Sequence, residues 1–442
     1  MRVLFISNDL IAGNLAYLLT KEGHDVKLYI DEKGRRGNFR NLVKQTKNWK
    51  KDLSWVGKDG LIIFDDVGYG QEQEQLRSSG YNVFGGSTSG DRLEFDRDFA
   101  QGIFAEYGLK IMPIKTYNTV QAALVYVENN PKAWVIKQNE HASKSINYIG
   151  QFNDGRDVIT VLKNYSQNSK LRDLKISIQE RIYGVEIGIG RYFNGYEWVG
   201  PVEYNVEHKK FFPGDVGPTT SEMGTLAWYD NNENNKLYRE TLGKLKPYLQ
   251  KINFRGDFEI NCIVNETGAY PLEATPRLGS PIIHLHSELH KSPWGEFLYA
   301  VACGKSYDLQ FSKEIGIVVL IAVPPFPYSK KITETNPKHV EIFFDDLTEK
   351  DFDHIHFEDI SFKKNRKKYY ISDSRGYVLY ITGTGKSIAD SRKNTYSLVK
   401  KVFIPKMFYR NDIGVSFAED SIGQLEKWGY FYINESGLIN GM

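Results

Sequence analysis

Cysteine and long apolar runs are both scarce in this chain of 442 residues. Cys262 and Cys303 are its only cysteines, too few for a disulfide framework or a thiolate metal site. No run of about eighteen apolar residues occurs, so no segment is expected to span a membrane. The chain also begins with an apolar strand pattern and not with a signal peptide. We therefore expect a protein of the reducing cytoplasm with no membrane partner.

A surplus of charge of either sign is missing too. Lys and Arg number 57, Asp and Glu number 55, and the formal net charge is +2. This balance provides no general attraction to nucleic acid or to an anionic membrane, so we expect small molecules and no nucleic acid as partners. The length allows two to four domains with separate cores. Monomer and dimer remain equally open.

The glycine-rich turn of dinucleotide-binding proteins is absent as well. Residues 1–6, 10–22 and 25–30 form the strand, helix, strand pattern of a parallel sheet. The turn between the first two reads SNDLIAGN, with Gly13 as its only glycine. Close phosphate approach needs a glycine-rich backbone, so a dinucleotide site is excluded here. Asn8 or Asp9 is instead expected to cap the helix.

Polar side chains follow successive strands of this first region. Asp65 and Asp66 come directly after an apolar strand at 61–64, and another strand is expected at 82–84. Ligands of open α/β sheets bind beyond the carboxyl ends of the strands. We predict an α/β domain in which Asn8 and Asp65 belong to a substrate site.

Residues 254–281 carry the most informative pattern. Two extended runs, 257–264 and 269–275, flank a turn at 265–268 and predict a hairpin. Strand alternation places Glu259 with Asn261 on one face and Glu273 with Thr275 on the neighbouring one. Facing carboxylates need a cation, which Arg277 or a divalent metal could supply. Hard oxygen ligands suit Mg²⁺, with Mn²⁺ as the alternative, and Mg²⁺ usually adds phosphate oxygens. A solvated hairpin is the competing interpretation.

The spacing F-E-x-N followed by E-x-T-x-R resembles the metal-binding strand pair of the ATP-grasp superfamily. The resemblance implies ATP as cosubstrate and Mg²⁺ bound by Glu259 and Glu273. Thr275 stands where the superfamily usually has Asn and offers a weaker oxygen. Arg277 would meet the transferring phosphate or the acyl phosphate, which makes it a catalytic residue by this resemblance.

The same resemblance assigns the nucleotide site. Lys137 ends an apolar V-I-K strand, the setting of the superfamily's phosphate-binding lysine, and is the second expected catalytic residue; a solvated strand end is the alternative. Residues 176–187 resemble the hinge beside the adenine, with a strand and bulge at Gly184 as the plainer interpretation. The implied nucleotide-binding residues are Arg97, Lys137, Lys144, Glu180, Arg181, Ile182 and Glu186.

A longer signature is more specific. The pattern H-K-K-x₄-G-D-x-G-P-T-T-x₂-M-G, from His208 to Gly224, resembles D-H-K-R … G-P-N-T-G-G-M-G of the phosphoribosylamine-glycine ligase family of purine synthesis. Further matches at 85–99, 178–186, 271–281 and 409–414 keep one order along the chain. The implied ligands of the small carboxylate or acyl phosphate are His208, Lys209, Asp215, Thr219 and Thr220, and His208 is also a candidate base.

This resemblance implies an α/β (α+β) ATP-grasp fold with three parts and a tail. Residues 1–90 would form a Rossmann-like pre-ATP-grasp domain and 91–305 the ATP-grasp domain, with a small lid subdomain at about 112–183. Residues 306–415 would form a β-rich closing domain. Residues 416–442 are an extra tail without a counterpart in the family.

Three departures from the family pattern bear on function. Arg97 replaces a lysine, and the loop after Lys137, QNEHASKSIN, lacks the glycines of the family's lid, although Ser143, Lys144 and Ser145 could contact phosphate. In the first domain, acidic residues replace the family's anion-binding segments. Such acidic residues would bind an amine or hydroxyl groups. We expect an ATP-dependent carboxylate-amine ligase with a changed acceptor. The alternatives are a non-catalytic nucleotide-binding or regulatory protein, and an interaction protein without nucleotide.

Overall fold

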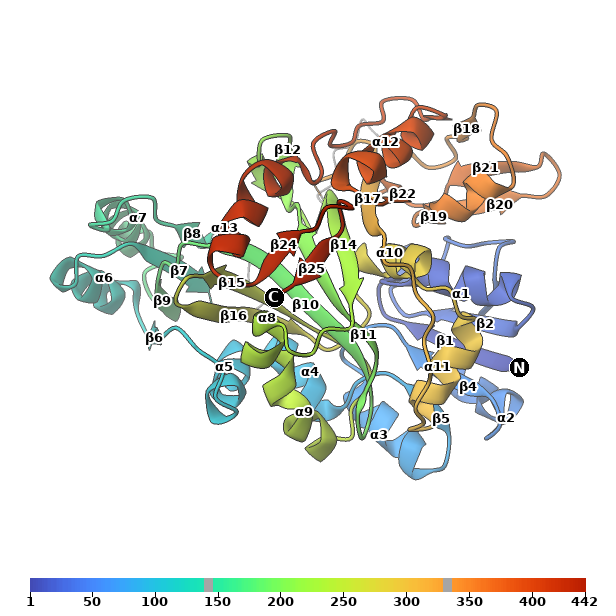
Figure 1. Cartoon of the computed structure of the whole chain (residues 1–442), viewed down its shortest axis with the longest axis horizontal. Coiled ribbons are helices and arrows are strands. Elements are labelled where there is room, and N and C mark those ends of the chain that lie inside the picture. Colours follow the sequence, from blue (N-terminus) through green and yellow to red (C-terminus); the bar gives the residue numbers. More distant parts are fainter. Residues whose placement is uncertain (139–145, 329–335) are drawn as a thin grey trace.

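A large sheet, a parallel N-terminal sheet and a small outlying sheet carry the fold (Figure 1). The structure is a computed structural model and describes residues 1–138, 146–328 and 336–442. No helix in these described ranges has both the length and the apolarity needed to cross a membrane. Lys144, with the neighbouring Ser143 and Ser145 of the expected lid, lies outside them.

The N-terminal sheet is parallel and has the strand order β3-β2-β1-β4-β5. Its strands are β1 (Arg2–Ser7), β2 (Asp25–Ile30), β3 (Lys44–Thr46), β4 (Leu61–Phe64) and β5 (Asn82–Phe84). Alternate residues of β1 enter two different cores, since Val3 and Phe5 pack on one face and Leu4 and Ile6 on the other. Burial on both faces explains why these strands read as continuous apolar runs. The helices of this region are α1 (Gly13–Lys21), α2 (Leu53–Val56) and α3 (Gly70–Ser78), with the short 3₁₀ turns η1 (Lys33–Arg35) and η2 (Trp49–Asp52).

The first helix starts later than expected. It begins at Gly13, and neither Asn8 nor Asp9 caps it. Leu10 has φ of +60°, and its backbone N–H donates to the Ser7 hydroxyl at 2.7 Å. The predicted cap is therefore wrong, because the turn is held by Ser7 and by the buried Asp65, which accepts from Ala12 N.

Two short helices follow the N-terminal sheet. They are α4 (Thr88–Phe95) and α5 (Arg97–Glu106). Asp96 between them is extended, and its carboxylate accepts from the backbone N–H of Phe99, which caps the second helix. Arg97 consequently stands at a helix start.

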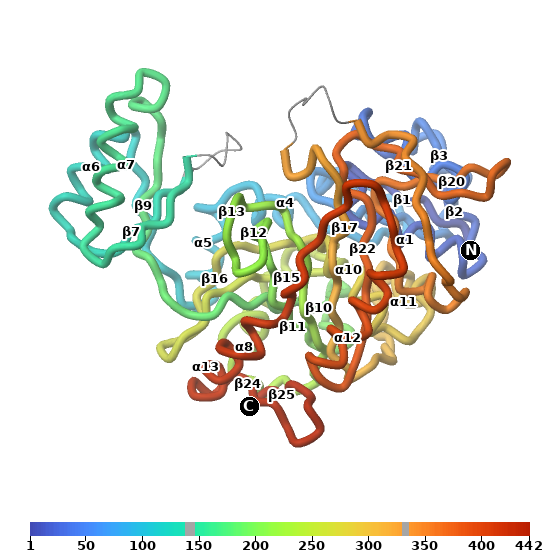
Figure 2. Tube along the Cα trace, turned by 90° about the horizontal axis from the view of Figure 1, so that it is seen from above, coloured from blue at the N-terminus to red at the C-terminus, as the bar shows by residue number. Residues whose placement is uncertain are grey.

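The small sheet is antiparallel and has a hydrophobic core of its own. Its order is β6-β9-β7-β8, with strands β6 (Ile114–Tyr117), β7 (Trp134–Gln138), β8 (Tyr148–Ile149) and β9 (Ile176–Glu180). Helices α6 (Val120–Asn129) and α7 (Arg156–Gln167) pack together on it. This unit projects from the rest of the molecule (Figure 2).

The large sheet has eight strands in the order β16-β15-β10-β11-β14-β17-β22-β19. They are β10 (Val185–Asn194), β11 (Trp198–Glu207), β14 (Gly224–Asp230), β15 (Arg255–Asn265), β16 (Gly268–Thr275), β17 (Ile315–Ala322), β19 (Ile355–Phe357) and β22 (Tyr377–Gly385). The pairing of β14 with β17 carries this sheet across residue 305, where the sequence pattern suggested a domain boundary. The helices that follow or cover its strands are α8 (Lys236–Glu240), α9 (Leu242–Lys251), α10 (Ile282–Leu289), α11 (Trp294–Ala302) and α12 (Ile388–Val399).

The remaining strands form short hairpins or pairs. They are β12 (Lys210–Phe212) with β13 (Val216–Thr219), β18 (Phe343–Phe344) with β23 (Val402–Phe403), β20 (Ile360–Lys363) with β21 (Lys368–Ile371), and β24 (Phe431–Ile433) with β25 (Ile439–Gly441). The other short helical segments are η4 (Lys350–His354), the π-helical η5 (Phe417–Ser421) and α13 (Ile422–Lys427). The tail beyond residue 415 is thus structured, and its Phe431 ring packs edge-on against Tyr204 and Trp228.

Candidate active site

The hairpin predicted from residues 254–281 is present as β15 and β16. Its register pairs Glu259 with Thr275 and Asn261 with Glu273, with an irregularity after Asn261. All four side chains therefore belong to one face of the large sheet. The predicted hairpin is therefore present with Glu259 and Glu273 on one face, and their joint role stays a prediction.

Two glycines of β10 let side chains meet above that strand. Gly188 lies between Asn205 of β11 and Asn261 of β15, and Gly190 lies between Glu203 and Glu259. A Cβ at Gly188 would come within 2.4 Å of the Asn205 Oδ1. Because no side chain intervenes, Asn205 Nδ2 donates to Glu259 Oε1 at 2.8 Å across the strand.

Lys209 is the cation beside Glu273. Its Nζ lies 2.7 Å from Glu207 Oε2, 3.0 Å from Glu186 Oε1 and 3.6 Å from Glu273 Oε1. Burial opposes this charge, yet the three carboxylates hold the pKa of Lys209 well above its usual value. Lys209 therefore takes a place beside Glu273 that was expected for Arg277 or a metal, whereas the family resemblance implies that Lys209 binds a substrate carboxylate.

Arg277 is directed toward the N-terminal domain. Its guanidinium donates to Glu94 at 3.0–3.2 Å and lies 3.5 Å from Asp66. Burial opposes its charge, but Glu94 and Asp66 raise its pKa. Burial raises the pKa of Glu259 and the positive charge of Arg277 opposes that rise, so Arg277 lies between Glu259 and the acids after β4.

Lys137 faces the hairpin from the small sheet. Burial, and then the neighbouring charge of Arg97, lower the pKa of Lys137 to about 8, while Glu273 and Glu186 favour its charged form. Lys137, Arg97, Glu186 and Glu273 are thus within electrostatic reach of one another. The small sheet and the large sheet therefore bring these predicted phosphate-binding residues close to one another.

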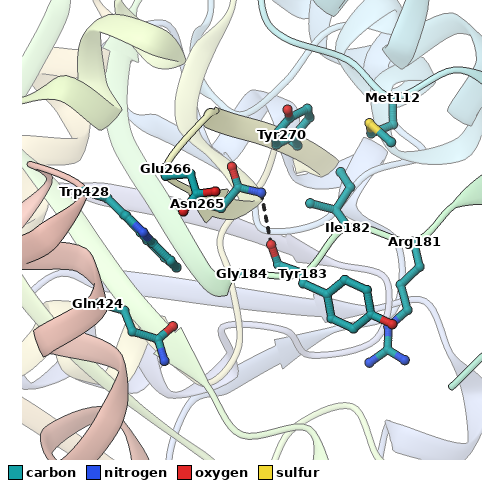
Figure 3. A pocket seen from close by; sticks show the side chains of 10 residues that line it. All are labelled: Met112, Arg181, Ile182, Tyr183, Gly184, Asn265, Glu266, Tyr270, Gln424 and Trp428. Atoms are coloured by element: carbon teal, nitrogen blue, oxygen red, sulfur yellow. Dashed lines mark hydrogen bonds between the residues drawn. The ribbon is translucent and has the colours of Figure 1, made fainter. Parts of the chain in front are cut away.

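The hinge between β9 and β10 is a break and not a strand with a bulge. β9 ends at Glu180, β10 starts at Val185, and Asn265 Nδ2 donates to Tyr183 O at 3.0 Å. Glu180 pairs with Lys132 at 2.8 Å, and the Arg181 backbone N–H donates to Ala133 O. Arg181 and Ile182 line a cavity of about 450 Å³ at this hinge (Figure 3).

Oxygen donors for a hard cation gather around Glu259. Burial, followed by the charge of Glu207, raises the pKa of Glu259 to about 7. Asn261 Oδ1 is buried and has no hydrogen-bond partner among the described residues. Nowhere in the described ranges do three or more His, Cys, Asp or Glu side chains form a metal-holding group. Glu259 and Glu273, with neutral oxygens from Asn261 and Thr275, remain the expected ligands of Mg²⁺, which would be completed by water or phosphate.

Three distant sequence patterns converge at His208. Its Nε2 accepts from Gly414 N at 3.2 Å, and burial followed by the nearby Arg410 charge lowers its pKa to about 4. The buried Arg410 pairs with Asp215 and with Asp412, both at 2.7 Å. Asp215 adopts φ of +54° in the β12–β13 turn. The closing segment thereby fixes the β12–β13 hairpin, and His208 is placed as part of that attachment.

The paired threonines of this region support the same hairpin. Thr220 donates from its backbone N–H and its hydroxyl to Lys209 O at 2.7 and 2.9 Å, and Thr219 Oγ1 accepts from Lys210 Nζ at 3.1 Å. Substrate contact by these threonines stays a prediction.

The acids of the N-terminal domain have different environments. Asp65 is fully buried, accepts from the Ser7 hydroxyl at 2.8 Å and from Ala12 N at 2.9 Å, and has its pKa raised to about 7 by burial and Asp66. Asn8 is exposed. Asp9 forms a two-pronged pair with Arg375 at 2.9–3.1 Å.

Several functional candidates carried no clear signal in sequence. Glu203, Asn205 and Glu207 lie on β11, whose pattern predicts only a strand. Glu222 is buried near Glu207 and Lys209, with Oε1 unpartnered among the described residues, and burial raises its pKa. The replacement of the family's Gly-Gly by Ser221-Glu222 was the one available clue.

Comparisons with known proteins agree with this geometry. A family model described as the ATP-grasp (A) domain of phosphoribosylglycinamide synthetase matches residues 95–281. Phosphoribosylamine-glycine ligase from Lactococcus lactis is 23% identical over 381 residues, covering 84% of this chain and 86% of the relative. The ligase of the same name from Listeria monocytogenes strain EGD-e is 24% identical over 428 residues, covering 92% of this chain and 96% of the relative.

Solved structures show the fold. The crystal structure of phosphoribosylamine-glycine ligase from Thermotoga maritima matches with a TM-score of 0.68 at 20% identity, over 93% of this chain and 100% of that one. Biotin carboxylase from Campylobacter jejuni matches with a TM-score of 0.61 at 10% identity, over 95% of each chain. The expected ATP-grasp fold is confirmed.

Proposed function

We propose that this chain is a divergent member of the phosphoribosylamine-glycine ligase family of ATP-grasp proteins and acts as an ATP-dependent carboxylate-amine ligase, which its similarity to that family supports. The observation that supports this proposal most directly is that Glu259 and Glu273 share one face of β15 and β16, and that Lys137 lies opposite this cation face. Such a face suits a divalent cation and a polyphosphate.

The chain's own residues would supply positioning and charge. When bound, ATP supplies the phosphoryl group that activates a carboxylate, and Mg²⁺, held by Glu259 and Glu273, balances its charge. Lys137 and Arg97 would neutralise phosphate oxygens from the lid side. Arg277 stands between this face and the acids of the N-terminal domain, where it can hold the activated carboxylate.

The acceptor is expected to differ from phosphoribosylamine. Asp9, Asp66 and Glu94 lie around Arg277 and Arg375, where carboxylates influence one another's pKa. Carboxylates repel a phosphate and stabilise an ammonium group. We therefore propose a small amino acid, glycine included, as the carboxylate substrate and an amine without phosphate as the acceptor.

A ligation assay tests this proposal. Glycine and other small amino acids are combined with Mg-ATP and a panel of amines, including phosphoribosylamine generated in place, and ADP release is measured. Glu273→Gln should lower turnover about 100-fold or more, because one carboxylate of the cation face is lost. The exposed Glu106→Gln is the matched control. ADP release at the parent rate in Glu273→Gln would contradict the assigned face.

A non-catalytic nucleotide-binding role is the second candidate. Thr275 in place of Asn and the glycine-free segment after Lys137 favour it. Binding of Mg-ATP without ADP release for any acceptor would select this role.

A further inference from the structure

The cavity at the hinge is built partly by the C-terminal tail. Gln424 and Trp428 line it together with Arg181 and Ile182 of the hinge. Figure 3 shows both tail side chains on one side of the space, Gln424 from α13 and Trp428 from the residue that caps its C-terminus, with the hinge on the other side. Trp428 keeps the helical conformation, so the two residues, four positions apart, form one wall of the cavity. This wall lies in the tail, for which the family pattern has no counterpart.

The cavity stands where the base of a bound nucleotide would lie. Tyr270, another lining residue, precedes Glu273 by three positions on β16. The irregularity in β16 leaves Tyr270 opposite Ile263 and Glu273 opposite Asn261, so Tyr270 and Glu273 share one face and lie two residues of β15 apart, roughly 7 Å at 3.3 Å per residue. Glu186 of β10 also pairs with Ile263, so it lies level with Tyr270 on the other side of β15.

The tail is held firmly in this position. Ile422 and Leu425 of α13 are buried in the main core, and Lys236 Nζ donates to Trp428 O at 3.0 Å. The Tyr430 hydroxyl donates to Glu240 Oε2 at 2.8 Å, and the same oxygen accepts from the first residues of β16 through Ala269 N at 2.9 Å. Trp428 is thereby fixed relative to the hairpin and needs no ordering when a ligand enters.

The lining has the chemistry that a planar heteroaromatic base requires. The indole of Trp428 offers a π face and the amide of Gln424 offers both a donor and an acceptor. Met112 and Ile182 provide apolar surface on the lid side. We propose that Gln424 and Trp428 of the tail complete the purine-base subsite and set the share of affinity that depends on the base. This inference rests on the proposed nucleotide function.

The test compares a nucleotide with its phosphate part alone. Binding of ATP and of inorganic triphosphate, each with Mg²⁺, is measured by titration calorimetry for the full chain and for Gln424→Ala, Trp428→Ala and Trp428→Phe. Trp428→Ala should weaken ATP binding about tenfold, because base stacking is lost. Triphosphate binding should stay within about twofold, and Trp428→Phe should restore most ATP affinity since it keeps an aromatic face.

Glu426→Ala is the matched control, because Glu426 is exposed on α13 between the two pocket residues. It should leave both affinities unchanged. Unfolding midpoints show whether each variant keeps its fold. The inference is overturned if Gln424→Ala and Trp428→Ala leave ATP binding unchanged, or if they weaken ATP and triphosphate equally. If the parent protein binds neither ATP nor triphosphate, the proposed function is contradicted, and this inference is contradicted with it.

Discussion

At the scale of the residue, Lys209 is the shared counter-charge of three carboxylates in the candidate site. Its ammonium group lies within 3.6 Å of Glu186, Glu207 and Glu273, which come from three different strands or their ends. Without it these three carboxylates would face one another with no counter-charge between them. The lysine therefore holds the three acids together at one place on the sheet.

Replacing this lysine tests that role. Lys209→Met should lower kcat/KM about 100-fold, because Glu186, Glu207 and Glu273 lose their shared counter-charge and their repulsion displaces Glu273 from its place. ADP release measured against Mg²⁺ concentration checks this, with the exposed Lys251→Met on α9 as control. A variant with the parent's activity at all Mg²⁺ concentrations would exclude Lys209 from the site.

At the scale of the element, β10 has two glycines where side chains would otherwise stand on the face of the candidate site. Its glycines at 188 and 190 leave a groove in the sheet through which β11 and β15 side chains touch. Glycine usually weakens a strand, and here it permits a close approach of neighbouring side chains. The strand is thus built for the site at a cost to its own stability.

Two glycine-to-alanine substitutions should have opposite effects. In Gly188→Ala the new Cβ displaces Asn205 and breaks its bond to Glu259, which should lower the free energy of unfolding by about 1–3 kcal/mol and reduce activity. In Gly102→Ala on α5 nothing lies within 4 Å, so helix propensity should add about 1 kcal/mol. Urea denaturation measures the free energy of unfolding of both variants. If the two substitutions change it in the same direction, the proposed close contact at Gly188 is contradicted.

At the scale of the whole molecule, Glu288 joins three regions. From α10 it pairs with His354 at 2.8 Å and His356 at 3.3 Å, and Thr382 of β22 donates to it at 2.5 Å. His356 also contacts Asn14 of α1 at 3.1 Å. Burial opposes ionisation, yet the hydrogen bonds from the two histidines lower the pKa of Glu288 to about 2.

This depressed pKa gives a defined acid response. Its folded value lies below the unfolded value of about 4.3, so the stabilisation is complete above pH 4.3 and is lost as pH falls toward 2. Glu288→Gln should lower the free energy of unfolding at pH 7 by about 3 kcal/mol and flatten its slope between pH 4.3 and 2. Unfolding series at several pH values measure this, with the exposed Glu419→Gln as control. An unchanged slope would contradict the assignment.

The sequence by itself determined several strands and the hairpin, and its motifs indicated the ATP-grasp fold. Apolar periodicity and turn residues are local properties, so β2, β4 and β5 have the expected bounds, and Glu259 and Glu273 were placed on one face through alternation. Only the tertiary structure decided which charges meet. Lys209 with Glu273, Arg277 with Glu94, Arg410 with Asp215 and the tail with the hinge are separated by 64 residues or more, and such pairings depend on how packed elements approach each other in space. No local pattern encodes that approach.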